Sequence, residues 1–369
     1  MKILYDHQIF VQRFGGISRY FFQLMKQFQF DRKVDFELSL KFSSNNYLSP
    51  SNYLKYSAFL KNINFRGKPK IEKFFNEIYS ISKIKKAEYD IFHATYYDPY
   101  FLRYINNKPF VLTVYDMIPE KLPHFFSLEN NETQCKKNLT QKARKIICIS
   151  ESTKKDLMEI FDIEEGKIDV IYLASSFTEN DVKKNTSMNL PKKYILFVGR
   201  RNGYKNFDFF IKSVAKLFLK DKLLKLLCAG SRGFTKEEND LFKELKIQEQ
   251  VIHFPINSDC VLAELYKNAL CFVFPSLYEG FGIPILEAFS CNCPVICSNL
   301  SSFPEVAGNA ALYFDPNDEE SIAIAVKRIL DEDDLRKDLI NKGRERGKEF
   351  SWKKCAQATK ELYESILQK

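Results

Sequence analysis

The sequence predicts an α/β protein built from two doubly wound domains. Short apolar runs, typical of buried strands, alternate with amphipathic stretches through most of the 369 residues. A polar stretch at residues 175–193 interrupts this alternation and has the composition of a linker. We therefore expect one domain over residues 1–174, a second over 194–350, and a C-terminal helix over 351–369 that could pack back on the first domain.

The first half of the chain contains six candidate strands, each a short apolar run. They lie at residues 3–5, 34–40, 91–93, 110–115, 145–149 and 169–172. Helical segments are expected to begin between them, near Gly16, Ile71, Leu128 and Ser152. Either Ser150 or Ser152 is suited to cap the last of these helices.

The second half repeats this organisation. Its candidate strands lie at residues 194–198, 223–229, 251–254, 271–274, 294–297 and 311–314, and charged helices follow from Glu319. In doubly wound domains, ligands bind beyond the C-terminal ends of the strands. The side chains that directly follow these strands are therefore the first candidates for function, and we expect a cleft between the two sets of strand ends.

The net charge of +9 is concentrated in the N-terminal part of the chain. Residues 1–150 hold 24 Lys and Arg against 13 Asp and Glu, an excess of +11, and the remainder is −2. A cationic half could face nucleic acid, anionic lipid or phosphorylated substrates. The alternative is the lysine-rich composition of a biased genome. No nucleic-acid-binding motif is present, so we do not expect nucleic acid as a partner.

Nine cysteines, with no C-x-x-C pair and no histidine at metal-ligand spacing, argue against a disulfide framework. Reduced thiols of this kind are typical of the cytoplasm. The sequence runs from Met1 straight into a strand, which leaves no room for a signal peptide. No uncharged apolar run approaches the ~20 residues of a membrane span. We expect a cytoplasmic protein that would meet a membrane only at its surface, on the inner face of the cytoplasmic membrane.

Two carboxylates, Glu279 and Glu287, lie eight residues apart around a glycine-rich helix start. Gly280 and Gly282 allow a ligand to approach the backbone closely, and the free N–H groups of a helix start attract its anionic or hydroxyl groups. Pro284 suits the first helical turn. Glu279 could accept from the same ligand, and Glu287 could reach ribose-like hydroxyls from within the helix. The alternative is a strand-to-helix turn with two solvated glutamates.

Cations follow the first strand of the second half, in Gly199-Arg-Arg-Asn-Gly-Tyr-Lys205. At the C-terminal end of a parallel strand, Arg200 and Lys205 would project toward the ligand, where a diphosphate needs both neutralisation and donors. Arg201 is an additional cation with a weaker claim to ligand contact. The alternative for the whole segment is a solvated turn.

Polar residues also follow strands of the first half. Gly15 and Gly16 permit close approach of a phosphate or sugar at a helix start, with Arg19 nearby; turns without any ligand also use paired glycines.

His93, Tyr115 and Asp116 end two further strands and could contact a sugar or acceptor. A lone His after a buried strand is as often structural, and Asp116 could instead cap the following turn.

The stretch 279–287, with Phe281, Gly282, Ile283 and Pro284 between its glutamates, resembles the E-x7-E signature of the retaining glycosyltransferases of family 4, which have the GT-B fold. An Arg and a Lys at the spacing of Arg200 and Lys205 belong to the same pattern. The resemblance implies an N-terminal acceptor-binding domain and a C-terminal domain that binds the nucleotide sugar. Many members carry His where this chain has Tyr115, so the usual sugar contact is in doubt there.

By this resemblance, the site residues take defined roles. Catalytic roles fall to Arg200, Lys205 and Glu279. Donor contacts fall to Gly15, Gly16, Gly280, Phe281, Gly282, Ile283, Pro284 and Glu287. Sugar or acceptor contacts fall to His93, Tyr115, Asp116 and Arg19. The donor would be a GDP- or UDP-linked sugar, with no cofactor and no metal, because the cations would take the metal's place.

The segments Asp6–Gln8 and Gly15–Tyr20 look most like those of bacterial enzymes that build O-antigen, capsule or related surface glycans in lipopolysaccharide biosynthesis, often mannosyltransferases. The acceptor would then be a glycan or a lipid-linked molecule. The alternative is a non-catalytic GT-B subunit that binds a nucleotide sugar or glycan and assists a partner glycosyltransferase.

Aromatic and basic residues mix in residues 53–60, in Arg66–Lys70 and at Phe74 and Phe75. Such a mixture suits peripheral contact with an anionic membrane. The alternative is a loop whose aromatic side chains fold back on their own domain.

Overall fold

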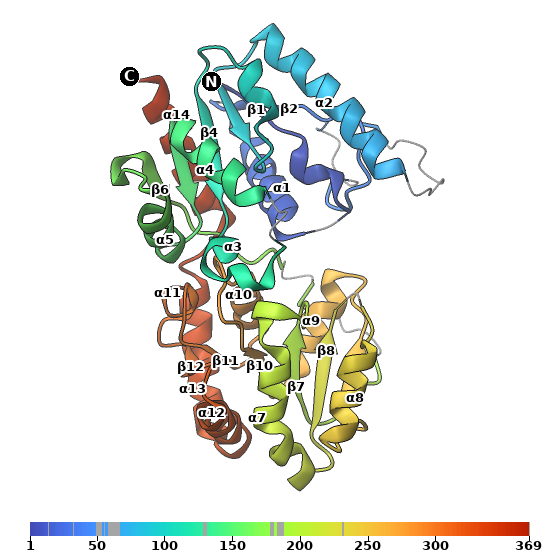
Figure 1. The fold of residues 1–369 in the computed structure, drawn as a ribbon. Coiled ribbons are helices and arrows are strands. Elements are labelled where there is room, and N and C mark those ends of the chain that lie inside the picture. The colour runs from blue at the N-terminus through green and yellow to red at the C-terminus, as the bar shows by residue number, and fades with distance from the viewer. Residues whose placement is uncertain are drawn as a thin grey trace. The chain divides into compact units, whose positions relative to one another are not determined.

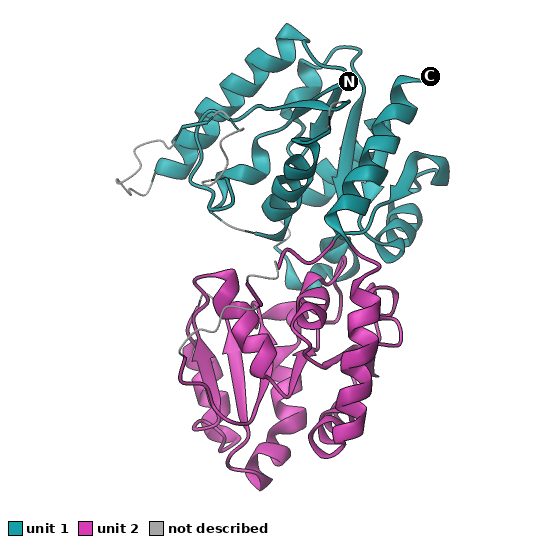
Figure 2. Ribbon diagram, turned by 180° about the vertical axis from the view of Figure 1, so that it is seen from behind, with its two compact units in different colours: residues 1–173, 351–369 teal, residues 174–350 magenta. Residues whose placement is uncertain are grey.

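The computed structural model describes residues 1–13, 15–31, 33–48, 54, 56–57, 67–127, 131–177, 181–182, 188–230 and 232–368. The chain forms two compact units (Figure 2). Unit 1 comprises residues 1–173 together with 351–369, and unit 2 comprises residues 174–350. Each unit contains its own six-stranded parallel sheet with helices packed against it (Figure 1). The predicted α/β class with two doubly wound halves is confirmed.

The sheet of unit 1 has the order β2-β1-β3-β4-β5-β6, and all its pairs are parallel. Its strands are β1 (Lys2–Tyr5), β2 (Asp35–Leu38), β3 (Ile91–Ala94), β4 (Phe110–Val114), β5 (Lys145–Cys148) and β6 (Ile168–Val170). Every residue of β3 and β4 is buried. Helices cover both faces of a parallel sheet, which is why its central strands read as continuous apolar runs.

The longer helices of unit 1 are α1 (Gly16–Phe28), α2 (Lys68–Lys86), α4 (Glu132–Lys142), α5 (Glu151–Phe161) and α14 (Trp352–Leu367), and α3 (Ile118–Lys121) is one short turn. Short 3₁₀ helices are η1 (Gln8–Val11), η2 (Pro99–Arg103), η3 (Pro123–Phe125) and η4 (Glu165–Lys167). Ser150 caps α5, because its Oγ accepts from the Thr153 N–H at 3.0 Å. The helix start expected near Leu128 lies outside the described residues.

Helix α14 packs against α1, although unit 2 separates the two helices in the sequence. The Trp352 ring lies 6.2 Å from the Tyr20 ring, and Lys360 Nζ is 2.6 Å from Asp31 Oδ2. The apolar face of α14 is thereby buried in unit 1.

The sheet of unit 2 has the order β12-β11-β10-β7-β8-β9 and is also parallel throughout. Its strands are β7 (Tyr194–Val198), β8 (Lys225–Ala229), β9 (Val251–Phe254), β10 (Cys271–Phe274), β11 (Val295–Ser298) and β12 (Ala311–Phe314). Its helices are η5 (Gly203–Lys205), α7 (Phe207–Lys220), α8 (Lys236–Glu244), α9 (Asp259–Asn268), α10 (Ile283–Ser290), α11 (Phe303–Ala307), α12 (Glu319–Asp331) and α13 (Asp333–Gly347).

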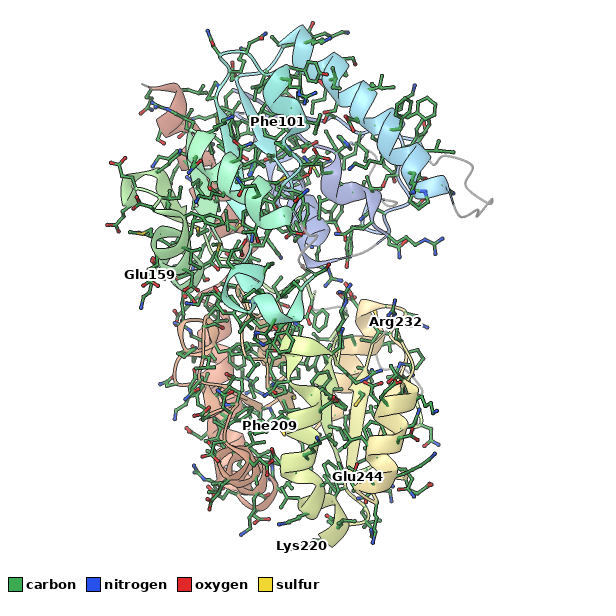
Figure 3. The ribbon with its side chains drawn as sticks, in the orientation of Figure 1. Phe101, Glu159, Phe209, Lys220, Arg232 and Glu244 are labelled. Carbon is green, nitrogen blue, oxygen red and sulfur yellow. The ribbon has the colours of Figure 1, made fainter. Side chains whose placement is uncertain are left out.

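One apolar core of unit 2 joins α7 and α12 to the sheet. Ile211 and Val214 of α7 share this core with Ile322 and Val326 of α12, and all four side chains are fully buried. Lys220 and Glu244 project from the outer surface of the unit (Figure 3). Burial on this scale, at about 25 cal/mol per Å² of apolar surface, is the main force holding such a unit together.

All nine cysteines are free thiols, and seven of them are buried. Burial raises the pKa of Cys271 to about 12, so this thiol stays protonated at neutral pH and packs as a small apolar group.

Candidate functional site

The candidate site of unit 2 lies where β7 and β10 end. The two strands are parallel neighbours in the sheet, so the segments that follow them begin at the same edge. The β7 segment turns at Gly199, whose φ of +114° favours glycine, and continues into η5. The Leu277 N–H donates to the Tyr204 carbonyl at 2.8 Å and ties the segment after β10 to η5.

Lys205 and Glu279 form an ion pair at this edge. Lys205 Nζ is 2.5 Å from Glu279 Oε1, and the two side chains are only 18% and 13% exposed. The ammonium group also lies over the rings of Tyr204, at 5.0 Å, and Phe274, at 5.6 Å. The sequence motifs predict two separate ligand contacts, Lys205 with the diphosphate and Glu279 with the sugar. The structure instead brings the two groups into direct contact, so a ligand would have to join or replace this bond.

Two serines hold the loop that carries Glu279. The Glu279 N–H donates to Ser301 Oγ at 3.0 Å. Ser302 Oγ lies 2.9 Å from the Glu279 carbonyl and 2.8 Å from that of Phe281, and donates to them. Neither serine could be identified from the sequence, because both follow a different strand, β11, and carry no motif of their own.

Gly282 is the residue directly before helix α10. Its φ is +103°, and an added Cβ would lie 3.3 Å from Ile285 Cδ1, so a larger residue would be both strained and crowded. Pro284 lies in the first helical turn, as predicted. Phe281 is buried with its ring 5.9 Å from Phe350, so its side chain contributes packing. Together with Gly280 and Ile283, these residues place the positive end of α10 beside the ion pair.

Glu287 lies within α10 and is only 6% exposed. The Tyr266 hydroxyl, from α9, donates to Glu287 Oε2 at 3.3 Å. Burial, and then the nearby Glu287 charge, raise the pKa of Tyr266 well above its usual value, so this phenol remains a hydrogen-bond donor. The sequence predicts that Glu287 faces a ligand and gives no sign of its hydrogen bond with Tyr266.

The adjacent arginines differ in environment. Arg200 is exposed. Arg201 is 9% exposed: its Nε lies 2.6 Å from Glu238 Oε1, its Nη2 donates to the Gly233 carbonyl at 2.8 Å, and its guanidinium covers the Phe234 ring at 4.8 Å. Glu238 also closes the capping box of α8 with Thr235. Arg201 therefore holds the start of α8.

In unit 1, Gly15 and Gly16 begin α1. Ser18 Oγ donates to the Gly15 carbonyl at 3.0 Å, and an added Cβ on Gly16 would meet no atom within 4 Å. Arg19 lies with its guanidinium carbon 4.9 Å from the centre of the Tyr47 ring. The helix start is therefore open at Gly16, with a cation one turn away.

His93 does not fit the expected sugar contact. It is fully buried, with Nδ1 2.5 Å from the Tyr363 hydroxyl and Nε2 2.9 Å from Thr113 Oγ1. Burial lowers the His93 pKa to about 3, so the ring is neutral. The Tyr363 hydroxyl also lies 3.0 Å from that of Tyr5. His93 therefore links β3 to α14 inside unit 1.

Tyr115 is also buried, and its hydroxyl donates to the Thr95 carbonyl at 2.8 Å. This bond directs the phenol into unit 1, in place of the sugar contact that the sequence suggested. Asp116 Oδ1 accepts from the Ile118 N–H at 3.0 Å, which agrees with the capping alternative. The buried Lys136 donates to the Asp116 carbonyl at 3.1 Å and to Glu120 Oε2 at 3.0 Å, a pairing that sequence reasoning missed.

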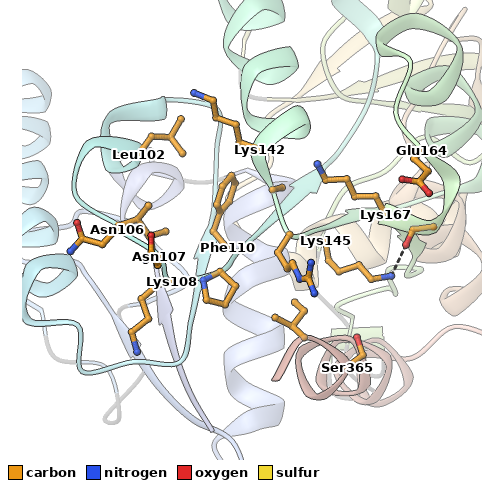
Figure 4. Close-up of a pocket in the computed structure, with 16 residues that line it drawn as sticks. Leu102, Asn106, Asn107, Lys108, Phe110, Lys142, Lys145, Glu164, Lys167 and Ser365 are labelled. Atoms are coloured by element: carbon orange, nitrogen blue, oxygen red, sulfur yellow. Dashed lines mark hydrogen bonds between the residues drawn. The ribbon is translucent and has the colours of Figure 1, made fainter. Parts of the chain in front are cut away.

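A hollow of about 850 Å³ lies elsewhere in unit 1, at the N-terminal ends of β4 and β5 (Figure 4). Lys108, Lys142, Lys145 and Lys167 line it, and Lys145 Nζ donates to the Gly166 carbonyl at 2.9 Å. This is the end of the sheet opposite to the strand ends that carry His93 and Tyr115, so the hollow is not part of the predicted site.

Among the described residues, no three His, Cys, Asp or Glu side chains are grouped so that they could hold a metal ion. Within that same part of the chain, none of the helices has the length and apolar character needed to span a membrane.

Two family models match the chain. "Glycosyltransferase Family 4" matches residues 14–174, and "Glycosyl transferases group 1" matches residues 178–346. The chain is 31% identical over 235 residues to O-antigen chain mannosyltransferase B of Escherichia coli, an alignment that covers 61% of each protein. It is 30% identical over 220 residues to O-antigen chain mannosyltransferase RfbU of Salmonella typhimurium, covering 59% of this chain and 60% of the relative.

These two alignments therefore span about three fifths of either relative's length. Among solved structures, Anabaena Alr3699/HepE in complex with UDP and glucose superposes with a TM-score of 0.74 at 16% identity. That superposition covers 99% of this chain and all of the other. Such similarity at low identity concerns the fold, and it confirms the predicted GT-B fold.

Proposed function

The chain belongs to family 4 of the glycosyltransferases, and we propose that it transfers a sugar from a nucleoside diphosphate sugar with retention of the anomeric configuration. The observation that carries this proposal is the Lys205–Glu279 pair beside the start of α10. It combines a cation for a diphosphate, an acceptor for sugar hydroxyls and a helix N-terminus, all at the C-terminal edge of one sheet.

In this proposal, binding of the donor breaks the contact between Lys205 and Glu279. Each of the two side chains then contacts the donor instead. The diphosphate takes the Lys205 ammonium, with Arg200 and the α10 N-terminus as further donors, and the sugar hydroxyls donate to Glu279. Glu287 accepts from the ribose. As the bond from the anomeric carbon to the diphosphate oxygen breaks, these positive groups stabilise the charge that grows on the leaving group.

The acceptor oxygen attacks from the face that the diphosphate leaves, and its proton passes to a diphosphate oxygen. No protein nucleophile is then required. The cations supply the charge stabilisation that a metal ion would otherwise give, so we propose a metal-independent reaction. Arg19 and Asp116 in unit 1 stay candidates for ligand contacts, whereas His93 and Tyr115 are buried and hydrogen-bonded inside unit 1.

Mannose is the proposed sugar, carried by GDP or UDP, because the matched relatives are named O-antigen chain mannosyltransferases. A glycan or lipid-linked acceptor of a bacterial surface polysaccharide is proposed on the same basis, with the protein acting at the cytoplasmic face of the membrane.

A thermal-unfolding panel of nucleoside diphosphates and their sugars tests the donor assignment. A ligand that binds only the folded protein raises the free energy of unfolding by about 2.7 kcal/mol when the free ligand concentration is one hundred times the dissociation constant. We expect one base to raise the unfolding temperature, with EDTA leaving this effect intact. Equal unfolding temperatures across the whole panel would contradict the proposed function.

A further inference from the structure

Helix α2 carries its large apolar side chains on the outside. Ile71, Phe74, Phe75 and Ile78 are 36%, 61%, 39% and 49% exposed. Their spacing of i, i+3, i+4 and i+7 places them on one face of the helix. Figures 1 and 2 show α2 along the outer side of unit 1. We name these four residues the α2 stripe.

The inner face of α2 is polar, the reverse of the usual arrangement for a helix that packs on a domain. Asn76 Oδ1 accepts from the Phe42 N–H at 2.8 Å, and Asn76 Nδ2 donates to the Phe42 carbonyl at 2.8 Å. The Ser80 hydroxyl lies 2.8 Å from that of Ser39 and 2.7 Å from that of Tyr100. Asn76 and Ser80 are fully buried. These hydrogen bonds hold the polar face of α2 against the rest of unit 1. The α2 stripe, on the opposite face, therefore points outward.

Exposed lysines lie beyond both ends of the α2 stripe. Helix α2 holds six Lys against two Glu, and two of these lysines, Lys73 and Lys83, pair with Asp98 and Glu37. Lys70, Lys85 and Lys86 are exposed beyond the two ends of the stripe. Beside it, the Phe75 ring lies 6.0 Å from that of Phe42, which Lys41 Nζ approaches at 5.5 Å. An outward apolar face with lysines at its margins is the composition of helices that lie in the interface of a membrane.

We propose that the α2 stripe docks unit 1 on a bilayer that contains anionic phospholipid. The apolar side chains would enter the boundary between headgroups and acyl chains, and the lysines would contact the phosphates. A second copy of the chain is the weaker candidate, because pairing two stripes would bring their like-charged lysines together. The inference concerns binding alone and does not depend on the proposed transfer reaction.

Co-sedimentation of the full chain with phosphatidylcholine vesicles, with and without phosphatidylglycerol, tests this proposal. We expect binding only to the anionic vesicles, weakened by salt. Phe74→Ser should lower the partition coefficient about tenfold, the scale of one buried aromatic side chain. Phe30→Ser is the matched control, since Phe30 is 80% exposed in the same unit and lies outside α2; it should bind like the wild type.

Three further variants keep the test independent of folding. Phe74→Trp preserves an apolar side chain and should show a blue-shifted emission when anionic vesicles are added, whereas Phe30→Trp should not. The double variant Lys70→Gln/Lys86→Gln should bind anionic vesicles less tightly than the wild type. Added salt should also reduce its binding less than it reduces that of the wild type. Wild-type protein that stays in the supernatant with anionic vesicles would overturn the proposal, and so would a stripe-dependent dimer in sedimentation velocity. Neither result would alter the outcome of the nucleotide panel.

Discussion

At the scale of single residues, local sequence identifies charged groups but not their partners. The motifs around Lys205 and Glu279 predict a role for each residue, but their direct contact depends on the pairing of β7 with β10. The positions of His93 and Tyr115 at strand ends predict ligand contacts, yet hydrogen bonds to distant residues turn both side chains inward. Those partners, Tyr363 and Thr95, could not be found without the tertiary structure.

The neighbouring arginines provide a matched pair of substitutions. Arg200→Ala should lower turnover of the donor by at least about tenfold, because an exposed cation for the diphosphate is lost, and should leave the unfolding temperature unchanged. Arg201→Ala should lower the unfolding temperature, because it leaves the Glu238 carboxylate without its buried partner. Steady-state kinetics and thermal unfolding of both variants check this. The roles given to the two arginines would be contradicted if Arg201→Ala lowered turnover and Arg200→Ala lowered the unfolding temperature.

At the scale of elements, the alternation of strands and helices was predictable because a parallel sheet requires it. The orientation of α2 was not, since a periodic apolar face ordinarily predicts the buried side. Here Asn76 and Ser80 find partners on Phe42, Ser39 and Tyr100, and these bonds determine the buried side.

The contact between α14 and β3 makes a stability prediction. Tyr363→Phe removes a buried hydroxyl that lies against His93 and Tyr5, so we expect the unfolding free energy to fall by about 1–3 kcal/mol. Urea unfolding at neutral pH measures this fall in the free energy of unfolding. The same midpoint urea concentration for Tyr363→Phe and the wild type would contradict the role given to this contact.

The lowered pKa of His93 predicts a pH dependence. The folded ring, with a pKa of about 3, stays neutral, whereas the unfolded ring binds a proton near its usual pKa of about 6.5. The unfolded state therefore binds more protons, and this contribution to stability falls as the pH drops from about 6.5 toward 3. His93→Asn should show a shallower loss of urea stability between pH 7 and pH 5 than the wild type. Parallel curves for the two proteins would count against a neutral buried His93.

At the scale of the whole molecule, the two units of the GT-B fold share the charge of the chain unevenly. Residues 1–150, all in unit 1, carry an excess of +11, and the candidate donor site lies in unit 2. The fold class could be read from the sequence because each unit repeats one local pattern. The C-terminal helix expected over residues 351–369 lies in unit 1 as α14, and the long-range contacts that hold it there, such as Trp352 with Tyr20, could not be identified from the sequence.

The central claim is that Lys205 and Glu279 hold the diphosphate and the sugar of one donor. Release of the nucleoside diphosphate from the sugar donor that the panel identifies tests it most directly, with wild type, Lys205→Ala and Glu279→Ala compared in one assay. Each substitution removes one preorganised charge contact, so turnover should fall by roughly 100-fold or more while the protein stays folded. Near-normal turnover in either variant would contradict the claim.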